Sequence, residues 1–373
     1  MTRATVFDPA SCPILVVKIG SALLVTPEGE VRRAWLAGVV ADLARRHAAG
    51  QKLILVSSGA IALGARRLGL PAGGRASLED AQAAAATGQI ALSHCWAELL
   101  GAEGLTAAQM LLTLDDLEDR RRYLNASATF ARLLSLGVVP VVNENDTVAT
   151  EEIRFGDNDR LAARVAQAAG AGGVVLLSDV DGLFTANPGV DPEARLIEDA
   201  VLDAATLAMA DRGSASGMGS GGMIAKLEAA RIAHAAGAHL AIIGGRRPDP
   251  LGAFRASGRG TVFAAGPGAP ARKAWLAGRL TAKGRILIDA GAAQALRQGA
   301  SLLPAGAIGV EGGFARGDVV DIVSDGRTLA RGLVEYDADQ ARRIAGLRTA
   351  ALAETLGHAP RAALVHRDHL VLL

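Results

Sequence analysis

Short apolar runs rich in β-branched residues alternate with longer stretches of helical periodicity over roughly the first 265 residues. The runs predict buried strands at 14–19, 53–56, 108–112, 138–142, 174–177 and 240–243. The stretches between them predict helices at 31–48, 79–100, 120–136, 159–169 and 224–236. Continuous apolar strands separated by helices require a sheet that is covered on both faces. The alternation therefore predicts an α/β fold with a mostly parallel central sheet and helices on both faces.

The pattern changes at the segment Gly266 to Pro270, whose glycines and prolines are typical of a linker. Beyond Lys283, short strand-like segments at 285–289, 307–310, 319–323 and 330–335 are separated by glycines. This spacing is typical of a small β-rich domain. We therefore expect a large α/β domain at 1–266, a linker at 267–280 and a small β-rich domain at 281–373.

Charge gives the chain no preference for a charged macromolecule, because its 373 residues carry a net charge of only +1. Only five of the 39 basic residues are lysines, at positions 18, 52, 226, 273 and 283. In a chain that favours arginine so strongly, the position of each lysine is informative.

Several classes of protein are excluded by composition. Two cysteines, Cys12 and Cys95, cannot build a disulfide framework and cannot form a zinc site by themselves. No apolar run approaches the 18 residues of a membrane span, and the N-terminus lacks the long apolar segment of a secretory signal peptide. Aromatic residues at 3% argue against a base-stacking surface. We expect a cytoplasmic protein with no membrane partner.

Two of the predicted strands end in segments that could bind an anion. Lys18 interrupts the first apolar strand, which is costly unless its ammonium reaches a polar cleft, and Gly20 allows close backbone approach. Ser57, Ser58 and Gly59 follow the second strand and lead into a helix, whose N-terminus favours negative charge. A lysine on an edge strand and simple N-capping serines remain open as alternatives.

Two polar clusters follow the strand at 138–142. Asn143-Glu144-Asn145-Asp146 comes directly after it, and Gly156-Asp157-Asn158-Asp159 follows shortly afterwards. Ligands of open α/β sheets bind beyond the carboxyl ends of the strands. The amides and carboxylates of these clusters can bind the ammonium and carboxylate of an amino acid, or orient lysines. An Asx-rich turn and a helix cap are the structural alternative.

The segment Gly217 to Lys226 contains four glycines and opens a predicted helix. It lacks the Gly-Lys-Ser/Thr of a P-loop, because Lys226 follows an alanine. We place Lys226 in the first helical turn, where repulsion from the helix dipole is tolerable only if an anion is bound. A flexible surface loop is the alternative. Together with Lys18 and the polar clusters, this segment favours phosphoryl transfer, which depends on positioning and charge neutralisation.

The motifs together resemble the glutamate 5-kinase family of the amino-acid kinase superfamily, over nearly the whole chain. The resemblance rests on VVKIGSALL, LVSSGAIALG, GQMLLT, VVPVVNENDTVAT, FGDNDRLAA, SDVDGLFTANP, GMGSGGMIAKLEAA and a tail ending in GLRTAALAETLGHAPRAALVHRDHL. It implies an amino-acid kinase fold, and the C-terminal β-rich segment resembles a PUA domain. It also implies an ATP- and Mg²⁺-dependent phosphorylation of the side-chain carboxylate of L-glutamate, the first step of proline biosynthesis.

The resemblance implies a role for individual residues of this sequence. Lys18 and Lys226 would contact the ATP phosphates and the migrating phosphoryl group, and Asp159 would hold both lysines. Ser58, Asp146 and Asn158 would bind glutamate, with Asn143 nearby. The implied nucleotide site consists of Lys18, Ser178, Asp179, Ser220, Gly221, Gly222, Met223, Ile224, Ala225 and Lys226. Ser178 and Ser220 replace threonines of some relatives and keep the hydroxyl group. The residues that would hold the metal are not assigned.

The resemblance further implies feedback inhibition by proline, a homo-oligomer (dimer or tetramer) and hand-over of the product to a glutamyl phosphate reductase. Two alternatives remain open. Another amino-acid kinase could act on aspartate, N-acetylglutamate or a nucleoside monophosphate with similar loops. RNA binding through the PUA-like domain is disfavoured, because the region from Lys283 onward has nearly balanced charge and only Phe314 and Tyr336 as aromatic residues.

Overall fold

The computed structural model describes residues 3–26, 28–148, 157–203, 206, 220–266, 282–357, 360–361 and 363–373. The chain divides into two compact units, Met1–Gly268 and Ala269–Leu373, and each is described by itself. The linker predicted at 267–280 lies outside the described residues. None of the helices in the described ranges is both long and apolar enough to cross a membrane.

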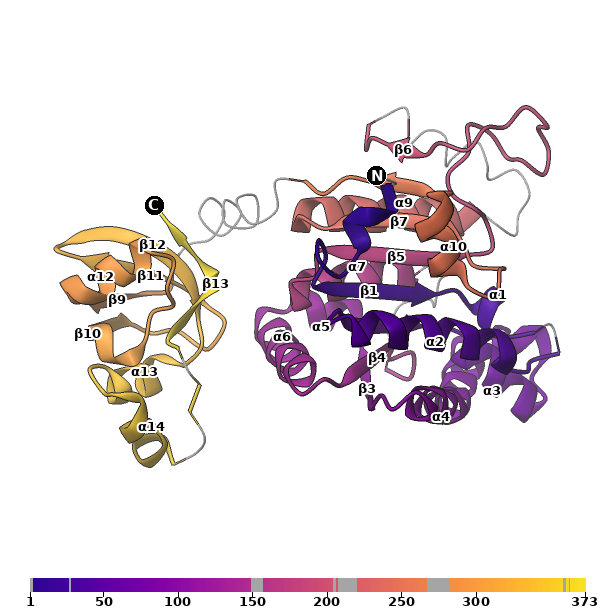
Figure 1. Cartoon of the computed structure of the whole chain (residues 1–373). Coiled ribbons are helices and arrows are strands. Elements are labelled where there is room, and N and C mark those ends of the chain that lie inside the picture. Colours follow the sequence, from indigo (N-terminus) through magenta and orange to yellow (C-terminus); the bar gives the residue numbers. More distant parts are fainter. Residues whose placement is uncertain are drawn as a thin grey trace. The chain divides into compact units, whose positions relative to one another are not determined.

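The first unit is built on an eight-stranded sheet with the order β3-β4-β2-β1-β5-β7-β8-β6 (Figure 1). Its strands are β1 (Ile14–Ile19), β2 (Lys52–Ser57), β3 (Ala107–Leu112), β4 (Val139–Glu144), β5 (Gly173–Ser178), β6 (Asp199–Ala200), β7 (His239–Gly244) and β8 (Thr261–Phe263). All neighbouring strands pair in parallel except β7 and β8, which are antiparallel. The predicted mostly parallel sheet is confirmed, and β6 and β8 are additional strands that the apolar pattern was too short to indicate.

Helices cover both faces of this sheet, as expected. They are α1 (Ser21–Leu24), α2 (Arg33–Ala48), α3 (Ala60–Leu68), α4 (Leu78–Ala102), α5 (Leu114–Glu118), α6 (Arg120–Ser135), α7 (Asp157–Ala169), α9 (Ser220–Ala236) and α10 (Pro250–Ser257). One core cluster joins α2, α4 and α10 to one face through Leu36, Trp96 and Phe254. A second cluster joins α6, α7 and α9 to the other face.

The alternation of side chains along β1 decides where Lys18 lies. Leu15, Val17 and Ile19 belong to the cluster with α2 and α4, whereas Val16 belongs to the cluster with α7 and α9. Successive side chains of a strand point to opposite faces, so Lys18 shares the face of Val16. The lysine therefore lies on the side of α7 and α9, at the carboxyl end of the strand.

Helices α3 and α4 cross at two glycines. A Cβ atom at Gly64 would overlap the carbonyl oxygen of Ala84, and one at Gly88 would overlap the carbonyl oxygen of Ala60. Only glycine allows two helix backbones to approach this closely. The crossing sets the position of α4, and with it the side chains that α4 presents toward β4.

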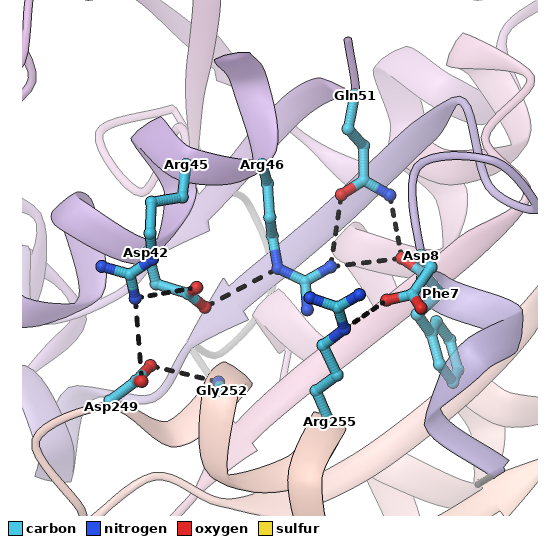
Figure 2. A network of polar contacts seen from close by, with 9 residues as sticks. All are labelled: Phe7, Asp8, Asp42, Arg45, Arg46, Gln51, Asp249, Gly252 and Arg255. Carbon is cyan, nitrogen blue, oxygen red and sulfur yellow. Dashed lines mark hydrogen bonds and ion pairs between the residues drawn. The ribbon is translucent and has the colours of Figure 1, made fainter. Parts of the chain in front are cut away.

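A polar network fixes the N-terminal turn at Arg3–Phe7 to the start of β1 (Figure 2). Gln51 donates to the carbonyl oxygens of Phe7 at 2.9 Å and Cys12 at 2.7 Å, and accepts from Arg46 at 3.3 Å. Figure 2 shows the rest of the network, in which Asp42, Arg45, Asp249, Gly252, Asp8 and Arg255 extend these contacts to α2 and α10. Hydrogen bonds between buried polar groups favour one arrangement of the chain, so this network anchors β1 at the end opposite Lys18. Among the described residues, Asp42 Oδ2 and Arg46 Nε make no hydrogen bond and meet only as an ion pair at 3.6 Å.

The second unit contains a five-stranded sheet with the order β10-β9-β11-β12-β13. The strands are β9 (Gly284–Ile288), β10 (Ala307–Gly312), β11 (Val319–Ser324), β12 (Arg327–Val334) and β13 (Val365–Leu372), and only β9 and β11 pair in parallel. The expected small β-rich domain is confirmed, although it also carries helices α12 (Ala290–Arg297), α13 (Ala338–Ile344) and α14 (Thr349–Leu356). These helices pack on the sheet through their own core cluster.

Candidate active site

The carboxylate of Asp159 lies between two buried lysines. Its Oδ1 atom is 2.5 Å from Lys18 Nζ, and its Oδ2 atom is 2.9 Å from Lys226 Nζ. The three residues come from β1, α7 and α9, and relative exposure is 6%, 0% and 9% for Lys18, Asp159 and Lys226. Buried charges are tolerated only when they are paired. These three groups together retain one net positive charge at the carboxyl end of the sheet.

We expected Lys226 in the first turn of its helix, and this expectation was wrong. Helix α9 begins at Ser220, so Lys226 falls in the second turn, where Nζ also donates to the carbonyl oxygen of Gly222 at 3.2 Å. The inference that its charge requires a bound anion also changes, because the Asp159 carboxylate already supplies one. The glycine-rich residues 217–219 lie outside the described residues.

The pKa values of this group follow from burial and mutual charge. Burial lowers the pKa of the Lys18 ammonium; Asp159 opposes this shift and the nearby Lys226 charge reinforces it. Burial alone would raise the pKa of the Asp159 carboxyl, but the charges and hydrogen bonds of Lys18 and Lys226 hold it below its ordinary value. Asp159 is therefore ionised across the neutral range, while Lys18 gives up its proton more easily than an exposed lysine.

Three of the expected glutamate-binding residues form one chain of hydrogen bonds. Asn158 Nδ2 donates to Ser58 Oγ at 3.0 Å and to Asn143 Oδ1 at 3.2 Å. Ser58 follows β2, Asn143 lies in β4, and Asn158 lies in the first turn of α7. The structure thus brings together side chains that were expected to meet at one edge of the sheet.

Gln89 of α4 extends this chain and was missed by the sequence analysis. Its Oε1 atom accepts from Asn143 Nδ2 at 2.7 Å, and its Nε2 atom donates to Ser93 Oγ at 3.1 Å. The spacing of Gln89 and Ser93 by four residues places them on one helix face. That local pattern gave no indication that the face meets β4, because the contact depends on how α4 packs.

The fourth expected glutamate ligand, Asp146, is buried and interacts electrostatically with Arg75. It lines a cavity of about 250 Å³ between α4 and the ends of β3 and β4. Gln89 lines the same cavity, so it borders both Asp146 and the chain that contains Asn143. The full lining is Ala85, Ala86, Gln89, Ile90, Gln109, Leu111, Glu144, Asn145, Asp146 and Thr147.

The expected nucleotide residues lie at the end of β5 and the start of α9. Ser178 Oγ donates to Asp179 Oδ1 at 3.2 Å, and the Asp179 charge acts on the pKa of Lys18. Arg246, which the sequence analysis did not single out, donates from Nε to the carbonyl oxygen of Asp179 at 3.1 Å. Ser220, Gly221, Gly222, Met223, Ile224 and Ala225 precede Lys226 in the first two turns of α9. Both segments therefore lie beside the paired lysines.

Comparison with known proteins agrees with this architecture. Residues 13–244 match the amino acid kinase family, and residues 284–356 match the PUA domain. The chain therefore belongs to the amino acid kinase family. It is 68% identical over 370 residues to a glutamate 5-kinase of Sphingopyxis alaskensis, covering 99% of this chain and 100% of that one. A glutamate 5-kinase of Zymomonas mobilis is 62% identical over 373 residues, covering 100% of this chain and 94% of that one. Within the amino acid kinases, this chain belongs to the glutamate 5-kinase family.

Proposed function

We propose that the chain transfers the γ-phosphoryl group of ATP to the side-chain carboxylate of L-glutamate, giving glutamyl 5-phosphate and ADP. This is the first step of proline biosynthesis. The observation that carries the proposal is the Asp159 carboxylate, which holds the Lys18 and Lys226 ammonium groups together at the carboxyl edge of the sheet. Ligands of open α/β sheets bind at this edge.

The reaction joins two anions, so its barrier depends on charge neutralisation. A glutamate carboxylate oxygen forms a bond to the γ-phosphorus, and the bond from that phosphorus to the β,γ-bridging oxygen breaks to release ADP. Lys18 and Lys226 lower the repulsion between nucleophile and phosphates, and stabilise the charge of the migrating group. The nucleophile is already ionised, so the step requires no general base.

The nucleotide is assigned to the residues beside the lysines. Ser178, Asp179 and the first turns of α9 would contact it, with Lys18 and Lys226 on the phosphates. Mg²⁺ supplies further neutralisation of the phosphates when bound, and in kinase sites it is held by one or two carboxylates together with phosphate oxygens. Asp179 fits this role, because its side chain is exposed at the end of β5 and only Oδ1 accepts from Ser178.

Glutamate is assigned to Ser58, Asn143, Asn158 and Asp146. A hydroxyl group, two amides and a buried carboxylate can together recognise the α-ammonium and α-carboxylate of an amino acid. Proline as a feedback inhibitor, a dimer or tetramer, hand-over to a glutamyl phosphate reductase and a cytoplasmic location complete the proposal, and these follow from the family relationship.

Trapping with hydroxylamine tests the substrate assignment, because an acyl phosphate reacts with it to give a hydroxamate. With ATP and Mg²⁺, the full chain should form a hydroxamate from L-glutamate in preference to L-aspartate or N-acetylglutamate. Preference for either competitor would assign the chain to a different amino-acid substrate. Including proline in the same assay measures inhibition directly, and salt-dependent retention of RNA by the full chain would support the RNA-binding alternative.

A further inference from the structure

We propose that Gln89 is a positioning residue that fixes which atoms the glutamate site presents to its substrate. This inference rests on the proposed function, and it concerns the orientation of the amide groups in the chain from Ser93 to Ser58. An amide side chain has a donor end and an acceptor end, so one fixed group can set the orientation of the next.

The orientation is fixed first at Ser93. Its hydroxyl oxygen lies 2.7 Å from the carbonyl oxygen of Gln89 and 2.8 Å from Gln109 Oε1, and both of these atoms are acceptors. The single hydroxyl hydrogen points to one of them, so the lone pairs of Ser93 Oγ are left to accept. Gln89 must then turn its Nε2 toward Ser93 and its Oε1 toward Asn143.

The same logic continues to the substrate side. Asn143 gives a hydrogen to Gln89, so its Oδ1 accepts from Asn158. Asn158 Nδ2 donates both of its hydrogens, one to Asn143 Oδ1 and one to Ser58 Oγ. The Oδ1 atom of Asn158 is buried and has no hydrogen-bond partner among the described residues.

The site consequently offers an acceptor and a donor of defined identity. Asn158 Oδ1 is the acceptor, and Ser58 keeps its own hydroxyl hydrogen because its oxygen accepts from Asn158. An α-ammonium group needs the acceptor and an α-carboxylate needs the donor. Loss of the Gln89 acceptor would allow the side-chain amides of Asn143 and Asn158 to turn over. Asn158 would then present an N–H group, in place of Oδ1, to the α-ammonium group of the substrate.

The test compares two substitutions of Gln89 in the full chain, Gln89→Met and Gln89→Glu. Methionine has a similar length but no hydrogen-bonding group for Asn143, so KM for glutamate should rise roughly tenfold or more. KM for ATP and kcat should stay within about twofold, because the lysines and the nucleotide segments are untouched. The Gln89→Glu variant retains an acceptor for Asn143 and should give a KM for the substrate glutamate closer to that of the wild type.

Two further variants separate positioning from general damage. Gln109→Met removes a glutamine from the same cavity wall. The Ser93 hydroxyl can still donate to the carbonyl oxygen of Gln89, so KM for glutamate should not change. Ser93→Ala removes the group that orients Gln89 and should raise KM for glutamate, as Gln89→Met does. It provides a second test if Gln89→Met fails to fold.

The proposal is overturned if Gln89→Met is folded and keeps the wild-type KM for glutamate, or if KM for ATP rises equally. If Gln89→Met does not fold, an unchanged KM in Ser93→Ala overturns it. Wild-type protein that forms no hydroxamate from glutamate would contradict the proposed function itself, which is a different result.

Discussion

Lys18 Nζ lies 2.5 Å from Asp159 Oδ1, in a pair whose two residues are almost completely buried. The second oxygen of the same carboxylate binds Lys226, so one anion holds two cations from different elements. Removal of one partner from a buried charge group costs far more than removal of a surface ion pair. The carboxylate is therefore both a structural group and the organiser of the proposed phosphoryl site.

Asp159→Asn should destabilise the chain as well as inactivate it. The substitution removes the one carboxylate that contacts both buried ammonium groups, and the free energy of unfolding should therefore fall by about 3 kcal/mol or more. Urea denaturation followed by circular dichroism measures the change. An equally stable variant would show that the lysines reach water or another anion when Asp159 is neutral.

Lys226→Met should lower kcat by about a hundredfold or more while the chain stays folded, because the charge that neutralises the transferring phosphoryl group is lost. Asp159 keeps Lys18 as a partner, so the loss of stability should be smaller than for Asp159→Asn. The hydroxamate assay and thermal denaturation give the two readouts. Lys52→Met is the control, since Lys52 is an exposed lysine at the opposite end of β2, and near-normal turnover in Lys226→Met would remove this lysine from the mechanism.

The alkaline limb of kcat/KM for ATP should lie below the ordinary pKa of a lysine. Burial lowers the pKa of Lys18, so its charged form is lost at a lower pH than in an exposed lysine. The Lys226 charge contributes to this lowering, and in Lys226→Met the limb of the residual activity should therefore move to higher pH. A pH profile of both proteins checks the direction, and identical limbs would show that another group titrates.

Gly88→Ala should separate α3 from α4 and lower the free energy of unfolding by about 1–3 kcal/mol, because the new Cβ atom overlaps the carbonyl oxygen of Ala60. Gln89 would move with α4, so KM for glutamate should rise in any folded fraction. Gly101→Ala lies on the same helix with open space around the added atom, and it should leave the chain equally or more stable. Chemical denaturation of the pair measures the difference, and similar stabilities would mean that the crossing tolerates a wider spacing.

The longer strands and helices of the first unit were predictable, since apolar periodicity is a local property of the chain, whereas the short elements α1, α5, α10, β6 and β8 were not predicted. The predicted strand at 14–19 coincides with β1, and the predicted helix at 224–236 lies within α9. The PUA-like unit was less predictable in detail. Its helices α12, α13 and α14 are only seven or eight residues long, and short helices give weak periodicity.

The sequence by itself determined the α/β alternation, the sharing of one strand face by Lys18 and Val16, and the clustering of polar residues after the strands. Those features depend on the two-residue and 3.6-residue periods of the backbone. The family resemblance implied that Asp159 holds Lys226. Only the tertiary structure decided that Gln89 meets Asn143 and that Lys226 reaches Asp159 from the second turn of its helix. These contacts join residues far apart in the chain, and they are set by the distance and angle at which helices pack on the sheet, which no local pattern encodes.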